Sequence, residues 1–260
     1  MIRLKSAHEI SILRENALIL CEILQGVLEA AEPGITTAEL DRLARELMQK
    51  AGARPAFLGY RGFPAAICAS INEEIVHGIP GPRRSLRDGD VVSIDIGIER
   101  NGLFADKAES VIVGQPSREA AELIEVAHQA LCRGIEQVSP GQRVGDISHA
   151  IGSYIESHGY GVVKRFVGHG IGRAMHEDPQ IPNFGPPGQG AKLMPGMVMA
   201  IEPMIWKETD RGRAENEEVV LADGWTVVTP HGQVAAHVED MILVTETGHE
   251  VLTKSLIQVH

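Results

Sequence analysis

Cysteine is scarce in this chain of 260 residues. Its three cysteines, Cys21, Cys68 and Cys132, are too few and too scattered for a disulfide framework or a zinc motif. Long apolar runs are also missing: no segment approaches the length of a membrane span, and no signal-peptide pattern opens the chain. From these absences we expect a cytoplasmic protein without membrane contact.

Positive charge is the second deficit. The chain has 24 Lys and Arg against 35 Asp and Glu, a formal net charge of -11, and no basic patch stands out. Proteins that bind nucleic acids use basic patches to neutralise phosphates, so we expect no DNA partner. The length fits one large domain or two small ones packed together.

Acidic residues in apolar surroundings are the informative feature that is present. An isolated carboxylate is costly to bury, whereas several carboxylates can share a bound cation. Four carboxylates and one histidine form a hard, oxygen-rich set that suits two divalent ions better than one structural zinc. Such a set points to two-metal hydrolysis. The candidate ligands, each in an apolar or glycine-rich segment, are Asp95, Asp106, His169, Glu202 and Glu239.

The segment VVSIDIGIERNGLFAD predicts a β-hairpin with Asn101-Gly102 as its two-residue turn. In that register Gly97 faces Asp106, and Asp95 becomes the diagonal neighbour of Asp106 on the same face. Diagonal Cα atoms lie roughly 7–8 Å apart, so the two carboxylates can reach a metal pair about 3.5–4 Å apart. The alternative, a surface hairpin with two solvated acids, is disfavoured by the apolar residues around Asp95.

The sequence also contains a repeat with an offset of 107 residues. It predicts two related halves, roughly 1–115 and 116–260, about a pseudo-twofold axis in a single catalytic domain. The repeated pairs are Pro33-Gly34 with Pro140-Gly141, Gly89 with Gly196, and Asp95 with Glu202.

Apolar periodicity and capping boxes predict an α+β fold. We expect two antiparallel sheets with helices on their outer faces and the acids on the inner side. The predicted helices run from Ser6 to about Ala31, Thr36 to about Ala51, Ser117 to about Val138, and Val144 to about Ser157. The predicted strands are Ala65–Ser70, Val91–Ile98, Leu103–Val113, Val163–Phe166, Val198–Met204, Val219–Leu221, Trp225–Thr229 and Ala235–Val244.

Spacing leaves some candidates open. Glu239 and Asp240 point to opposite faces of one strand, and spacing alone does not decide which of them is the ligand. His77 and His176 are candidates for holding a substrate, with a structural role equally compatible with their spacing. The aromatic residues and cysteine near them, Tyr60, Phe63, Cys68 and Trp225, fit either a pocket wall or plain core packing.

Seven segments, in order over essentially the whole chain, resemble those of the type I methionine aminopeptidases: SINEEIVHGIP, GDVVSIDIG, FVGHGIG, HEDPQIPNFG, LMPGMVMAIEPM, DGWTV and HVEDMILVTETG. The resemblance implies the pita-bread fold, with a central metal site between pseudo-twofold halves. It implies removal of the initiator methionine from nascent chains whose second residue is small. It further implies a cytoplasmic monomer that associates transiently with the ribosome.

The resemblance also implies two divalent ions, for which cobalt, manganese, iron and zinc are the candidates. Asp106, His169, Glu202 and Glu239 would bind one ion, and Asp95, Asp106 and Glu239 the other. Asp106 and Glu239 would bridge the two ions, which decides between Glu239 and its neighbour.

The same resemblance assigns catalytic roles. Glu202 would handle the proton of the attacking water, His77 would contact the substrate near its scissile nitrogen, and His176 would hold the carbonyl oxygen. The methionine pocket would comprise Phe57, Tyr60, Phe63, Cys68, Met175 and Trp225. The chain departs from the family pattern, mainly around this pocket and behind the acids, at Phe57, Gly97, Lys107, Glu109, Met175 and Asp240.

Two other readings compete with this one. Proline-specific peptidases of the same fold share the metal ligands, but usually carry an extra N-terminal domain that this sequence does not show. A non-enzymatic pita-bread protein that binds peptides would be expected to lose ligands, whereas this chain keeps all five and both histidines.

Overall fold

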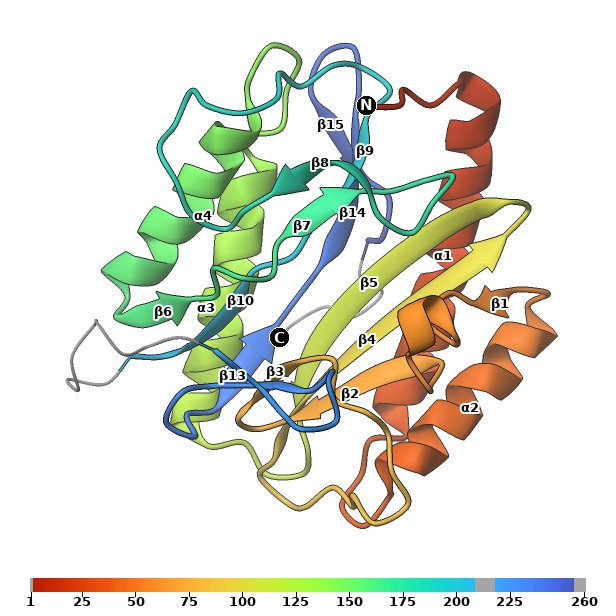
Figure 1. The fold of residues 1–260 in the computed structure, drawn as a ribbon, viewed down its shortest axis with the longest axis vertical. Coiled ribbons are helices and arrows are strands. Elements are labelled where there is room, and N and C mark those ends of the chain that lie inside the picture. Colours follow the sequence, from red (N-terminus) through yellow and green to blue (C-terminus); the bar gives the residue numbers. More distant parts are fainter. Residues whose placement is uncertain (1, 209–217, 255–260) are drawn as a thin grey trace.

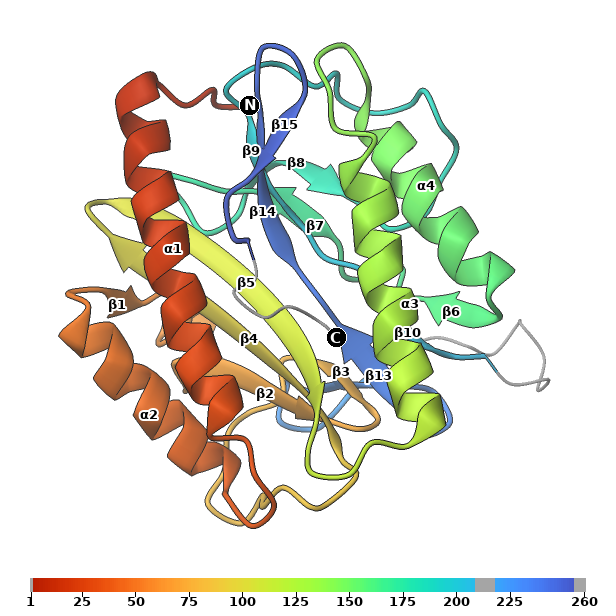
Figure 2. The ribbon, with the colours of Figure 1, turned by 180° about the vertical axis from the view of Figure 1, so that it is seen from behind.

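A computed structural model describes residues 2–208 and 218–254 of the chain. The strands lie in front of the helices in Figure 1, and the helices lie in front in Figure 2, so all four helices cover the same side of the sheets. In the described residues no helix is long and apolar enough to cross a membrane. The helices are α1 (Ala7–Glu29), α2 (Thr37–Lys50), α3 (Arg118–Ile135) and α4 (Val144–Ser157), with one 3-10 turn, η1 (Tyr60–Gly62).

The first two helices begin at the predicted capping boxes. Glu9 N donates to Ser6 Oγ at 3.3 Å, and Ser6 N donates to the Glu9 carboxylate at 2.8 Å. Thr36 and Glu39 exchange the same two bonds at the start of α2. All four predicted helices are confirmed, and their ends differ from the prediction by at most three residues.

The strands form antiparallel pairs throughout, but in four small sheets rather than the two predicted. The first sheet contains β1 (Arg54–Pro55), β2 (Ile67–Ile71), β4 (Val91–Arg100) and β5 (Leu103–Ile112). The second contains β6 (Tyr160–Val162), β10 (Met204–Lys207) and β13 (Ala235–His237). The third contains β3 (Glu74–Val76), β11 (Val219–Val220) and β12 (Val227–Val228). The fourth contains β7 (Gly168–Gly170), β8 (Glu177–Ile181), β9 (Val198–Ile201), β14 (Asp240–Val244) and β15 (His249–Val251).

Several predicted strands were wrong in extent. The strands predicted over Val198–Met204 and Ala235–Val244 are each divided in two, because Pro203 has no N–H to donate to a partner strand. The strand predicted over Val163–Phe166 is wrong, since β6 ends at Val162 and the exposed Lys164 follows. The strands that the pattern missed are short and mostly polar or glycine-containing: β1, β3, β6, β7, β8 and β15.

The predicted hairpin is confirmed residue by residue. Gly97 pairs with Asp106, and Arg100 pairs with Leu103 beside the turn. Asn101 and Gly102 have φ angles of 54° and 76°, and the left-handed region at both turn positions is what an Asn-Gly turn provides. Asp95 and Asp106 therefore share a face of the sheet.

The repeat is visible in the backbone. Gly34 N donates to Leu86 O at 2.8 Å, and 107 residues later Gly141 N donates to Leu193 O at 3.1 Å. All four glycines of the repeat have positive φ angles, which explains why glycine recurs there: Gly34, Gly89, Gly141 and Gly196. Isolated bridges recur at the same offset, joining Thr36 with Ser85 and Arg143 with Lys192.

The described residues form three apolar cores, of which the two largest correspond to the two sides of the molecule. One packs α1 and α2 against β2, β4 and β5, and the other packs α3 and α4 against β9 and β14. Helix α1 buries residues spaced three and four apart, the pattern of one helix face: Leu13, Ala17, Leu20, Leu24 and Val27. The described residues that line the candidate site come from strands and from the segments between them, and none comes from α1 to α4.

Candidate active site

A cavity of about 310 Å³ brings together residues that are far apart in the sequence. All five predicted metal ligands line it, as do His77 and His176. Each ligand comes from a different element or its edge. Asp95 lies in β4, Asp106 in β5, His169 in β7, Glu202 just after β9, and Glu239 just before β14.

His169 is oriented by the backbone. Its Nδ1 lies 3.0 Å from Gly170 O, so Nδ1 carries the proton and the lone pair of Nε2 faces the cavity. That Nε2 atom lies 3.5 Å from the Glu202 carboxylate and 3.8 Å from Asp106. The glycines around His169 allow neighbouring strands to pack closely, since a Cβ on Gly168 would lie 2.4 Å from Ala200 O.

Glu202 and Glu239 lie in the gap between the divided strands, and other residues hold their backbones. Asn183 Nδ2 donates to Glu202 O at 2.9 Å. Glu239 N donates to Ala108 O at 2.9 Å, and Lys107 Nζ donates to Glu239 O at 3.2 Å. Thus β5 fixes the backbone of Glu239 on both sides.

The charges of the four acids oppose one another. Burial raises the pKa of Asp95 to about 7 and the pKa of Glu202 to about 8. Burial and the neighbouring carboxylates raise the pKa values of Asp106 and Glu239 well above the ordinary range. A divalent cation among these groups would favour their ionised forms and relieve the repulsion.

The donor set fits such a cation. Asp106, His169 and Glu239 each offer a ligand atom, and these atoms lie within 4.8 Å of one another. Buried oxygens of Asp95, Asp106 and Glu239 have no hydrogen-bond partner among the described residues. Buried polar atoms without partners are rare and call for an explanation, and oxygen ligands awaiting a divalent ion supply one.

Aromatic side chains form the wall of the cavity beside the acids. The rings of Phe63 and Trp225 meet edge to face with their centroids 5.1 Å apart, and Tyr60 stacks on His176 at 5.2 Å. Phe57 and Cys68 line the same cavity and are buried. A cavity lined by both apolar rings and acids suits a ligand that has an apolar side chain and a polar backbone.

His77 and His176 are both neutral at physiological pH. Burial, with the neighbouring His237 and His176, lowers the pKa of His77 to about 4. Burial, with His169 and Arg61, lowers the pKa of His176 to about 3. A neutral imidazole can donate one hydrogen bond and accept another, as groups that orient a peptide must.

Met175 does not line this cavity, unlike the other residues predicted for the pocket. It is 2% exposed and lies in the apolar core, in the layer behind the wall. A Cβ on Gly97 would lie 2.6 Å from the Phe57 ring and 3.1 Å from the Met175 methyl. Three of the departures from the family pattern therefore form one contact group, in which glycine makes room for phenylalanine.

The other departures lie on the opposite face, as strand alternation predicts for Lys107 and Asp240. Lys107 Nζ lies 2.6 Å from Asp240 Oδ1, and Thr253 Oγ1 donates to the same oxygen at 2.7 Å. Glu109 accepts a hydrogen bond from His128 Nε2 at 2.7 Å.

Sequence reasoning missed His237, whose Nε2 lies 3.6 Å from the Glu202 carboxylate. The 107-residue offset does not point to His237, which lies 131 residues after Asp106, and only the pairing in the folded chain relates the two. His237 pairs with Met204, as Asp106 pairs with Gly97, and Met204 is the 107-residue counterpart of Gly97. The other lining residues that the sequence did not single out are Arg61, Val76, Arg165, Phe166, Val167, Gln180 and Met204.

Comparisons with known proteins identify the family of this chain. The model of metallopeptidase family M24 matches residues 11–246. The methionine aminopeptidase of Clostridium acetobutylicum is 47% identical over 97% of this chain and 99% of its own length. Methionine aminopeptidase 1 of Bacillus subtilis is 46% identical over 98% of this chain and 100% of its own length.

A solved structure extends the likeness to three dimensions. The crystal structure of methionine aminopeptidase from Thermotoga maritima has a TM-score of 0.92 and 42% identity, and the match covers 98% of this chain and 100% of that one. The pita-bread fold that the resemblance implied is thereby confirmed. The chain belongs to metallopeptidase family M24 and, within that family, to the methionine aminopeptidases.

Proposed function

We propose that this protein removes the N-terminal methionine from nascent proteins and peptides whose second residue is small. The reaction is hydrolysis of the first peptide bond with the help of two divalent ions. The observation that carries the proposal is the group of buried and half-buried acids with His169, which shares one cavity with apolar residues. Residues 1–260 act as a single catalytic domain, with halves of roughly 1–115 and 116–260.

Five residues hold the ions. Asp106, His169, Glu202 and Glu239 would bind one, and Asp95, Asp106 and Glu239 would bind the other, so that Asp106 and Glu239 would be ligands of both. When bound, divalent ions would supply Lewis-acid chemistry, namely a lowered pKa for the attacking water and opposition to negative charge on the substrate oxygen. Manganese, iron, cobalt and zinc all suit such ligands, and supply decides among them.

Glu202 takes the proton of the attacking water. Burial raises the pKa of Glu202, and a bound ion would oppose that rise and keep the carboxylate ionised, the form that can accept the proton. The bond from Asn183 to Glu202 O fixes the backbone from which this carboxylate projects.

Two neutral histidines orient the peptide. His77 contacts the scissile nitrogen, and His176 donates to the carbonyl oxygen on which charge develops. Removing one such oxyanion donor costs about 2.7–4 kcal/mol in other enzymes. The stacked ring of Tyr60 holds the imidazole of His176 in place.

The methionine side chain lies against the apolar wall. Phe57, Tyr60, Phe63, Cys68 and Trp225 contact it, while Met175 lies in the core beside Gly97, as Phe57 does. A bulky second residue would collide with the cleft wall beside the ions, so alanine and glycine are accepted there and isoleucine and arginine are not.

The proposal has a direct test. Protein purified without added metal is analysed for its metal content, then assayed on Met-Ala-Ser, Met-Ile-Ser and Ala-Pro-Ser peptides with each candidate ion. We expect cleavage of Met-Ala-Ser alone. Preferential cleavage of Ala-Pro-Ser would favour the proline-specific alternative, and metal-loaded protein that cleaves none of them would favour the binding-module alternative.

The cellular setting is part of the proposal. Because its substrates are nascent chains, the protein works in the cytoplasm as a monomer that contacts the ribosome transiently. Sedimentation with ribosomes that carry a nascent chain, compared with sedimentation of the free protein, tests both statements. Stable dimers in the free sample, or equal sedimentation with and without ribosomes, would contradict them.

A further inference from the structure

His77 is held in a backbone conformation that histidine disfavours. Its φ angle is 60°, in the left-handed region where a side chain crowds the backbone. Its ring lies between Phe166 and Trp225, at centroid distances of 5.3 and 6.0 Å. Such a conformation persists only where the surrounding structure holds it.

The next residue, Gly78, is fixed to strand β2. Gly78 N donates to Ser70 Oγ at 3.1 Å, and Ala69 N donates to Gly78 O at 2.9 Å. A Cβ on Gly78 would lie 2.5 Å from Ala69 O, so only glycine allows this approach. The peptide that follows His77 therefore has little freedom to move.

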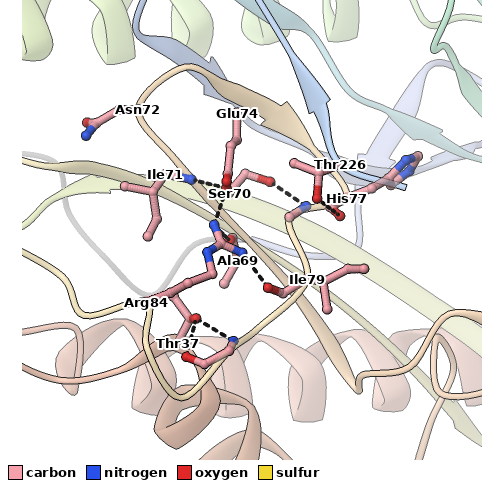
Figure 3. A network of polar contacts seen from close by, with 12 residues as sticks. Thr37, Ala69, Ser70, Ile71, Asn72, Glu74, His77, Ile79, Arg84 and Thr226 are labelled. Carbon is pink, nitrogen blue, oxygen red and sulfur yellow. Dashed lines mark hydrogen bonds and ion pairs between the residues drawn. The ribbon is translucent and has the colours of Figure 1, made fainter. Parts of the chain in front are cut away.

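Arg84 joins the two ends of the segment from Ala69 to Ile79, which carries His77 (Figure 3). Its guanidinium donates to Ile79 O and to the Glu74 carboxylate, and it lies 3.3 Å from Ala69 O. Glu74 also accepts a hydrogen bond from Ile71 N at 2.9 Å. One guanidinium thus ties β2, the start of β3 and the loop after His77 together, using the planar fork that only arginine offers.

The opposite side of His77 is held less firmly. The Thr226 hydroxyl lies 3.5 Å from His77 O, but it also donates to Asp223 at 2.6 Å. A hydroxyl has one proton, and the shorter bond takes it. On this side the backbone of Trp225 hydrogen-bonds the His77 ring, whereas the backbone that follows His77 is restrained from the side of Arg84.

We propose that Glu74 and Arg84 are positioning residues for catalysis, which act by holding the His77 imidazole in the cavity. This inference rests on the proposed function, in which His77 contacts the scissile nitrogen. Neither Glu74 nor Arg84 lines the cavity that contains the acids. Any effect of these two residues on turnover must therefore pass through the segment that carries His77.

A double-mutant cycle tests the inference. Arg84→Gln is made in the wild-type protein and in His77→Ala, with kcat and KM measured on Met-Ala-Ser. We expect Arg84→Gln to lower kcat by between about ten- and a hundredfold, the effect of misplacing a reacting group, with a much smaller change in KM. In the His77→Ala background we expect no further loss, because the two changes act through one group.

Matched variants sharpen the result. Arg84→Lys keeps the charge beside Glu74 and should recover part of kcat. Arg83→Gln is the control, since Arg83 is exposed and has no hydrogen bond or ion pair to the described residues. An equal loss of kcat from Arg84→Gln in both backgrounds would overturn the inference.

A second readout does not depend on turnover. The imidazole nitrogen signals of His77 in NMR spectra should shift in Arg84→Gln and stay in place in Arg83→Gln. Unshifted His77 signals in a folded Arg84→Gln protein would also overturn the inference. If Arg84→Gln does not fold, Arg84→Lys and Glu74→Gln take its place. An inactive wild-type protein would refute the proposed function, while the NMR comparison would still decide this one.

Discussion

The two strand pairs that carry the acids follow equivalent registers, yet one is continuous and the other is interrupted. In the first half, β4 and β5 pair without a break from Val91 opposite Ile112 to Arg100 opposite Leu103. In the second half, β9 pairs with β14 up to Ile201 opposite Asp240, and pairing resumes in β10 and β13 at Met204. The interruption contains Glu202 and Glu239.

This difference shows two ways to place an acid. The continuous pair places Asp95 and Asp106 through register and alternation alone. The interrupted pair releases Glu202 and Glu239 from strand pairing, and their backbones need Asn183 and Lys107 as substitutes. Such substitutes come from distant segments, so the second half depends more on tertiary contacts.

The largest expected effect on ion binding and activity comes from a substitution of Asp106, in the continuous strand pair. Asp106→Asn should abolish the binding of paired ions and lower kcat/KM by about a thousandfold or more, because a bridging ligand is lost. His237→Asn, at the equivalent position of the second half, should keep both ions. Metal analysis after dialysis, together with kinetics, checks this. Two ions retained by Asp106→Asn would contradict the bridging role.

The second test concerns the interrupted pair. Glu202→Gln should retain at least one ion, yet lower kcat by about 10²–10⁴-fold, the usual contribution of a general base. Metal content and kcat on Met-Ala-Ser are measured on the same preparation. A near-normal kcat would remove Glu202 from the role of base.

The buried ion pair that joins the two strand pairs should matter for stability. The side chains of Lys107 and Asp240 are 5% and 17% exposed. Lys107→Met leaves Asp240 charged and unpaired, and should cost about 3–5 kcal/mol in the free energy of unfolding. Urea denaturation of this variant, and of Lys107→Met with Asp240→Leu, measures the effect. A double variant no more stable than the single one would show that pairing is not the cause.

The contact group behind the pocket wall should respond more weakly. Gly97→Ala pushes a methyl group into the Phe57 ring, and overpacking of this kind costs about 1–3 kcal/mol. Phe57→Ala in the same chain should remove the clash, so that the two substitutions together cost less than the sum of their separate effects, and should widen the pocket towards norleucine and leucine. Thermal unfolding and the kcat/KM ratios for Met, norleucine and Leu substrates test both parts. Additive effects of the two substitutions would contradict the contact.

The smallest effect is a pH dependence from Glu109 and His128. Burial lowers the pKa of His128, but the hydrogen bond and the charge of Glu109 outweigh it, and the net pKa is raised above 6.5. The pair therefore stabilises the fold fully below pH 6.5, and the stability is lost as pH rises through the raised pKa. His128→Gln should flatten this part of the stability curve, as urea denaturation between pH 5 and pH 9 would reveal; an unchanged slope would count against it.

The sequence by itself determined the local geometry of the site. The Asn101-Gly102 turn set the register of β4 and β5, alternation put Asp95 and Asp106 on one face, and capping boxes began α1 and α2. These features depend on neighbours in the chain, so a pattern of residues is enough to predict them. The repeat allowed part of the second half to be predicted as well, because the same residues recur there at an offset of 107.

The features of the site that depend on long-range contacts were decided only by the tertiary structure. It divided the predicted strands at Glu202, placed Met175 behind the pocket wall, and brought His237 to the acids. Lys107 meets Asp240 across 133 positions of the chain, and Arg84 closes a loop around His77 through backbone carbonyls. No local pattern encodes such contacts, because their strength depends on burial and on partners that only the folded chain brings within reach.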